Sequence, residues 1–146
     1  MRYLILLILT TLPLIAQADD YGSATVQQVT SIYDGDTFRA DLAGPNGEPW
    51  PDIIGHRAPI RVAGVDTPEI RAECDAEKQA ARQAKQFTVA HLRDAERIRL
   101  EHLDRGKYFR LVANVMIDGR DLGQMLIDAG LGVPYGGGHK TNPWCE

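Results

Sequence analysis

The chain has few cysteines, few aromatic residues and no excess of positive charge. Its two cysteines cannot build a structural zinc site without histidines, and the four histidines are scattered along the sequence. With 16 basic against 20 acidic residues the formal net charge is −4, so the chain as a whole has no electrostatic attraction for nucleic acid. Neither an internal repeat nor a low-complexity tract is present, and one ordinary domain is expected.

Only one long apolar run is present, and it lies at the N-terminus. Arg2 precedes an apolar stretch that reaches Ile15, and Ala16-Gln17-Ala18 has the form of an A-x-A cleavage site. Because the run is short for a membrane span, we interpret residues 1–18 as a signal peptide; a retained anchor is the alternative. The mature chain, residues 19–146, is then expected to be exported, periplasmic or secreted, and free of the membrane. Loss of Arg2 changes its net charge to −5.

The two cysteines, Cys74 and Cys145, both lie in the mature chain. Export to an oxidising compartment favours a single disulfide between them, and two free thiols are the alternative. A bridge would tie the penultimate residue to the middle of the chain. Closing so long a loop contributes about 2–4 kcal/mol to stability.

Alternation and turn signals predict a mainly β (α+β) fold. Asp34-Gly35 is the strongest hairpin signal, and the Asp75 region opens the best amphipathic helix. We expect strands at residues 26–33, 37–42, 58–65, 98–103 and 111–117, helices at 75–95 and 121–130, and a long loop at 44–57. Five strands with a helix between the third and fourth, and a short second helix, suggest a small five-stranded OB-type barrel.

One segment after the third predicted strand concentrates charge. If residues 61–65 form a strand, Arg61 and Val65 share a face, and Pro68 ends the strand soon after. Asp66 and Glu69 then lie on a stiff turn, close enough to converge on one ligand. A plain turn explains the same residues, because Asp, Thr and Pro are common in turns.

Charged residues elsewhere complete a set with chemical meaning. Asp36 at the hairpin exit, Asp66 and a carbonyl near Thr67 offer oxygen ligands, which favour Ca²⁺ or Mg²⁺ over zinc. The guanidinium groups of Arg61 and Arg110 match phosphate oxygens. A metal, two arginines and a spare carboxylate suffice for in-line displacement at a phosphodiester. A surface ion pair and a strand-edge charge are the alternatives for the arginines.

Three segments in order, Tyr33-Asp34-Gly35-Asp36-Thr37, residues 61–69 and Lys107-Tyr108-Phe109-Arg110, resemble the signatures of the staphylococcal-nuclease-like (thermonuclease) family. The resemblance covers nearly the whole mature chain and implies an OB-type barrel carrying a Ca²⁺-dependent nuclease for DNA and RNA. By matching position, the resemblance implies that the Ca²⁺ ligands are Asp36, Asp66 and the Thr67 carbonyl. It implies that the catalytic residues are Arg61, Arg110 and Glu69, with Glu69 as the general base. The implied substrate-binding residues are Lys107, Tyr108 and Tyr135.

Two features depart from that family. The loop between Asp36 and Arg61 is longer than in the type enzyme, and Phe109 replaces a glycine beside Arg110. A competing hypothesis is a non-catalytic OB-type module that binds single-stranded nucleic acid, but the chain has few aromatics and is acidic. A third is a small domain whose acidic turn only holds Ca²⁺. We expect a monomeric enzyme whose partner is its nucleic acid substrate.

Overall fold

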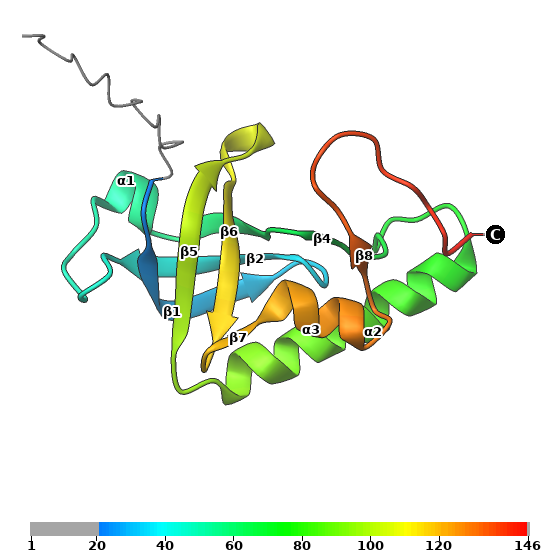
Figure 1. Cartoon of the computed structure of the whole chain (residues 1–146), viewed down its shortest axis with the longest axis horizontal. Coiled ribbons are helices and arrows are strands. Elements are labelled where there is room, and N and C mark those ends of the chain that lie inside the picture. The colour runs from blue at the N-terminus through cyan, green and yellow to red at the C-terminus, as the bar shows by residue number, and fades with distance from the viewer. Residues whose placement is uncertain (1–20, 146) are drawn as a thin grey trace, which may run out of the picture.

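The computed structural model describes residues 21–145, and the predicted signal peptide lies outside these residues. The chain forms short and long strands, three α-helices and one 3-10 helix, η1 (Figure 1). In order they are β1 (Ala24–Ile32), β2 (Thr37–Ala43), α1 (Asp52–Gly55), β3 (Ala58–Val62), β4 (Val65–Asp66), α2 (Asp75–Asp94), β5 (Ile98–Arg105), η1 (Lys107–Phe109), β6 (Leu111–Ile117), β7 (Arg120–Asp121), α3 (Leu122–Asp128) and β8 (Val133–Pro134).

The five long strands close into a barrel. Their order is β3-β2-β1-β5-β6, with antiparallel neighbours, and parallel pairing of β3 with β6 closes the ring. The first hairpin turns at residues 33–37, where the Tyr33 amide donates to the Thr37 carbonyl at 2.9 Å. The predicted mainly β, OB-type barrel with a helix between its third and fourth long strands is confirmed.

Alternation along the strands builds the core. In β2, Phe38, Ala40 and Leu42 are buried, while Arg39 on the opposite face is exposed. The long helix α2 packs beside the barrel through a stripe that includes Ala84 (Figure 1). Thr88 of that helix donates its hydroxyl to the Gly35 carbonyl at 2.6 Å, so α2 is tied to the first hairpin.

The structure corrects the predicted end of the third strand. β3 stops at Val62 rather than Val65, because Gly64 adopts φ +76° and turns the chain. Residues 65–66 then form the separate strand β4, which pairs with β8 near the C-terminus. The turn therefore detaches Asp66 from the barrel wall and brings the segment after α3 beside it.

Smaller differences concern loops and helix ends. The predicted loop at residues 44–57 contains the single turn of helix α1, and β5 continues to Arg105 beyond its predicted end. Asp121 caps the predicted second helix, because its carboxylate accepts from the Gln124 amide at 3.0 Å, and Gly130 with φ +69° follows α3.

Candidate active site

The first hairpin and the turn after β3 are locked together by Asp36. Its backbone carbonyl accepts from the Val62 amide at 2.8 Å, and its Oδ2 accepts from the Thr67 amide at 2.9 Å. Asp36 is 1% exposed and Asp66 is 3% exposed. Two carboxylates from segments 30 residues apart are thus brought together in a buried place, as the sequence interpretation required.

Arg61 joins these two carboxylates. One guanidinium nitrogen pairs with Asp36 Oδ1, and the other lies 2.9 Å from Asp66 Oδ1 and 3.2 Å from the Val65 carbonyl. Burial acts to lower the pKa of Arg61, but the two aspartates outweigh it and raise that pKa above its ordinary value. Arg61 is a partly buried, permanently charged group that joins two buried carboxylates, and not the exposed surface ion pair that was its alternative.

Lys140 is a second cation at the same place, and sequence reasoning did not find it. Its Nζ lies 2.8 Å from Asp66 Oδ1 and 2.7 Å from Glu69 Oε1, so Asp66 and Glu69 do converge on one cationic group. Partial burial acts to lower the pKa of Lys140, yet hydrogen bonds with Asp66 and Glu69 raise it overall. No local pattern marks this residue, which is 71 positions from Glu69.

Glu77, near the start of α2, is the other residue missed. It is 3% exposed, and its Oε1 accepts from the Glu69 amide at 3.0 Å while its Oε2 accepts from the Asn142 side chain at 2.8 Å. The spacing Cys74-x-x-Glu77 matches that of a capping box, a signal that could have drawn attention to it. The Glu77 amide does donate to the Cys74 sulfur at 3.4 Å.

The predicted disulfide between Cys74 and Cys145 is present, with Cα atoms 5.8 Å apart. Within residues 21–145, the three side chains whose potential metal ligands lie within 4.8 Å of one another are these cysteines and Glu77. Because both sulfurs are bonded to each other, they offer no thiolate to a metal. The group is a covalent tie beside the candidate site, and it attaches the C-terminus to the first turn of α2.

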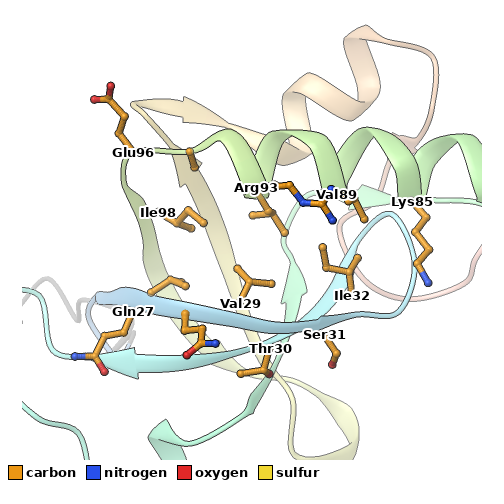
Figure 2. A pocket seen from close by; sticks show the side chains of 14 residues that line it. Gln27, Val29, Thr30, Ser31, Ile32, Lys85, Val89, Arg93, Glu96 and Ile98 are labelled. Atoms are coloured by element: carbon orange, nitrogen blue, oxygen red, sulfur yellow. The ribbon is translucent and has the colours of Figure 1, made fainter.

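A hollow of about 790 Å³ is lined by Arg61, the residue that pairs with both buried aspartates. Its walls include every residue predicted to be catalytic or substrate-binding, together with Lys140: Arg61, Glu69, Arg110, Lys107, Tyr108 and Tyr135. A second hollow, between β1 and α2, contains none of them; Figure 2 shows Val29 and Ile32 of β1 facing Val89 of α2 there. The predicted catalytic and substrate-binding residues therefore gather at one place, whereas the predicted metal ligands Asp36, Asp66 and Thr67 are not among the residues that line it.

The segment Lys107–Phe109 presents aromatic rings at the edge of that hollow. Tyr108 and Phe109 both have φ +59° and are 84% and 79% exposed. Left-handed backbone at Phe109 explains why the resembled family has glycine at this position. The Phe109 ring lies 5.1 Å from the Arg105 guanidinium, while Arg110 lies 5.8 Å from the Tyr108 ring. Phe109 consequently leaves Arg110 in the wall of the hollow.

Asp34 lies in the turn of the first hairpin, where it lines the same hollow, and it is 5% exposed. Burial, aided by the neighbouring Asp36 charge, raises the pKa of Asp34 to about 7. Its Oδ1 accepts from the Asp36 amide at 3.2 Å, so it supports the loop that carries Asp36.

The donor set fits a hard divalent cation. Asp36 and Asp66 contribute buried carboxylate oxygens, and these are satisfied only by the positive groups of Arg61 and Lys140 and by hydrogen bonds. The buried hydroxyl of Thr67 also has no hydrogen-bond partner among the described residues. Oxygen donors without free sulfur or histidine are suited to Ca²⁺ or Mg²⁺.

Comparison with known proteins agrees with this geometry. The family described as staphylococcal nuclease homologue matches residues 59–142, more than half of the 146-residue chain. The matched segment contains Arg61, Asp66, Glu69, Arg110 and Lys140, whereas Asp36 precedes it. No curated protein matches the chain. The buried acidic pair, the arginine-lined hollow and the barrel thus occur in a chain that belongs to the staphylococcal nuclease homologue family, with the nuclease-type activity that this membership indicates.

Proposed function

We propose that this protein is an exported Ca²⁺-dependent nuclease that hydrolyses phosphodiester bonds of DNA and RNA. The observation that carries the proposal is a single hollow lined by Arg61, Arg110 and Glu69, in which Arg61 pairs with the buried carboxylates of Asp36 and Asp66. Cationic forks and an exposed carboxylate around one space are the groups needed for in-line attack of water on a phosphodiester.

Asp36, Asp66 and the Thr67 carbonyl would hold the metal ion. A bound divalent cation supplies charge neutralisation for the scissile phosphate. The chain holds the Asp36 carboxylate in place through the Thr67 amide, and Arg61 balances the charge of both aspartates.

Arg61 and Arg110 would bind the phosphate. Their planar guanidinium groups offer paired donors that match phosphate oxygens and gain strength as charge builds up in the transition state. Arg110 is only loosely held, by a 3.4 Å hydrogen bond to the Lys107 carbonyl and by the Tyr108 ring, so it is available to a ligand.

Glu69 would orient the attacking water and accept its proton. Its side chain is 49% exposed and faces the hollow, while its backbone amide is fixed by buried Glu77. A rigid backbone with an exposed carboxylate is the arrangement that positions a general base without burying it.

Local charge would offset the acidity of the chain towards a polyanionic substrate. The hollow is lined by four cationic side chains, those of Arg61, Lys107, Arg110 and Lys140. Tyr108 and Tyr135 add rings on which bases stack, and Tyr135 lies 5.8 Å from the Arg61 guanidinium. The acidic net charge of the mature chain, −5 after loss of Arg2 from the −4 of the full sequence, is therefore compatible with binding at this face.

Export is supported by the form of residues 1–18 and by the disulfide, which is typical of oxidising compartments. No helix within residues 21–145 has the length and apolarity needed to cross a membrane. Fractionation of the producing cells, with the N-terminus of the mature chain determined, tests export and cleavage after Ala18.

The activity is tested with the purified mature chain and single-stranded DNA, supplied with Ca²⁺, with Mg²⁺ or with chelator. Glu69→Gln should lose at least about a hundredfold in turnover, as expected for a general base. Glu73→Gln removes the same charge from an exposed glutamate nearby and serves as the matched control. Cleavage that persists in chelator, or in Glu69→Gln, contradicts the proposed chemistry. Nucleic acid binding without cleavage would instead support the non-catalytic binding module.

A further inference from the structure

The C-terminal strap, residues 136–145, is fixed at both ends beside the candidate active site. Just before it, the Tyr135 amide donates to the Gly64 carbonyl at 3.0 Å, and the Tyr135 hydroxyl donates to Gly138 at 3.0 Å. At its far end the Cys145 disulfide joins the strap to α2. Figure 1 shows this segment leaving β8, arching over and ending beside the start of α2. Lys140 lies between the two fixed ends.

Asn142 adds a third tie within the strap. Its side-chain nitrogen donates to Glu77 Oε2 at 2.8 Å, and its side-chain Oδ1 accepts from the Trp144 amide at 3.2 Å. The same Glu77 carboxylate holds the Glu69 amide through its other oxygen. One buried carboxylate thus sets the position of both the general-base turn and the strap that carries Lys140.

We propose that Lys140 is the chain's own counter-cation for the Asp66–Glu69 pair, and that it competes with a divalent cation for the Asp66 carboxylate. The inference rests on the proposed function in one respect, the presence of a metal site at Asp36 and Asp66. Lys140 would then set the metal affinity of the enzyme, and the Cys74–Cys145 disulfide would hold the strap so that Lys140 stays close to the two carboxylates.

The competition follows from shared oxygen atoms. Asp66 Oδ1 accepts from both Arg61 and Lys140, at 2.9 and 2.8 Å. A divalent cation ligated by the same carboxylate would repel an ammonium group held this close, so Lys140 has to withdraw when the cation enters. Because Lys140 has to leave Asp66 before the cation binds, a change that weakens the lysine contact strengthens metal binding.

Lys140 differs from an ordinary surface lysine. It bridges two carboxylates, one of which has a side chain only 4% exposed, and its backbone is already restrained by the strap. Lys78 provides the contrast, because its partner Asp75 is 98% exposed and a single 3.2 Å contact joins them. An exposed ion pair such as Lys78–Asp75 contributes little free energy, whereas the contact of Lys140 with the buried carboxylate of Asp66 contributes more.

The test is calorimetric titration of the purified mature chain with CaCl₂ at low ionic strength. Lys140→Gln should bind Ca²⁺ about tenfold more tightly than wild type, the factor expected for loss of one competing charge-assisted contact. Lys78→Gln removes the same charge from α2 and should stay within about twofold of wild type. Equal affinities for the two variants, or weaker binding by Lys140→Gln, would overturn the competition.

A second measurement needs no metal. In chelator, urea unfolding of wild type, Lys140→Gln, Glu69→Gln and the double variant forms a mutant cycle. The unfolding constant of the double variant should depart about two- to fivefold from the product of the single effects, as for a half-exposed ion pair. If the effects of the two single substitutions on unfolding are strictly additive, Lys140 and Glu69 do not interact, which contradicts the role given to Lys140.

The outcomes separate this inference from the proposed function. A wild-type chain that neither binds Ca²⁺ nor cleaves DNA overturns both. A chain that binds Ca²⁺ and cleaves DNA, but whose Lys140→Gln variant shows wild-type affinity, overturns the competition alone.

Discussion

Glu77→Ala is the most informative single substitution in this chain. Glu77 is buried, and its two oxygens accept from the Glu69 amide and from Asn142. The substitution removes both acceptors at once. It leaves the backbone amide of Glu69, the general base, and the side-chain amide of Asn142, which holds the strap, without their acceptor.

The magnitude can be worked from these contacts. Hydrogen bonds to a charged acceptor contribute about 1.5–3 kcal/mol each to stability. The substitution also removes the desolvation cost of burying the Glu77 carboxylate, which offsets part of this loss. We expect a net loss of about 2–4 kcal/mol in the free energy of unfolding, and a Tm lower by about 10 °C. Turnover should fall at least about tenfold, because small displacements of catalytic groups have effects of this size.

The assay pairs urea unfolding with single-stranded DNA cleavage measured well below the Tm of the variant. Glu73→Ala, at an exposed position of the preceding turn, is the control and should change neither quantity appreciably. Glu77→Gln keeps one acceptor for the Glu69 amide and should lie between wild type and Glu77→Ala. If Glu77→Ala lowers stability but leaves kcat unchanged, Glu77 is structural only and the positioning argument fails.

Three further predictions concern the disulfide, a buried acid and a strained loop. Reduction of Cys74–Cys145 should lower stability by about 2–4 kcal/mol, and a melt unchanged by reductant would contradict this. The pKa of Asp34 is raised to about 7 by burial, so the folded state holds a proton that the unfolded chain releases near its ordinary value. In chelator, stability should fall as the pH rises from about 4 to about 7, and Asp34→Asn should flatten this dependence; a parallel slope in the variant would refute it. Phe109→Gly should raise the free energy of unfolding by about 0.5–1 kcal/mol by relieving left-handed backbone, and a loss measured by urea unfolding would show that the exposed ring has a packing role.

Features that depend on neighbours in the chain were predictable. Alternation in β2, the nearly continuous apolar run of β6, the Asp34-Gly35 turn and the apolar stripe of α2 are local patterns, and the barrel follows from their order. The end of β3 was misjudged because strand-like residues continue to Val65, while the left-handed turn at Gly64 depends on a single backbone angle. The one-turn helix α1 carries too little periodicity to be recognised.

The amino-acid sequence by itself determined the barrel, the acidic and arginine residues of the candidate site, and the two cysteines that pair. Only the tertiary structure decided which charges meet. Lys140 reaches Asp66 and Glu69 because the strap is tied back across 71 residues, and Glu77 serves both segments because it lies buried between them. Periodicity and motif spacing describe what lies within a few residues, whereas contacts of this kind arise from chain closure in three dimensions.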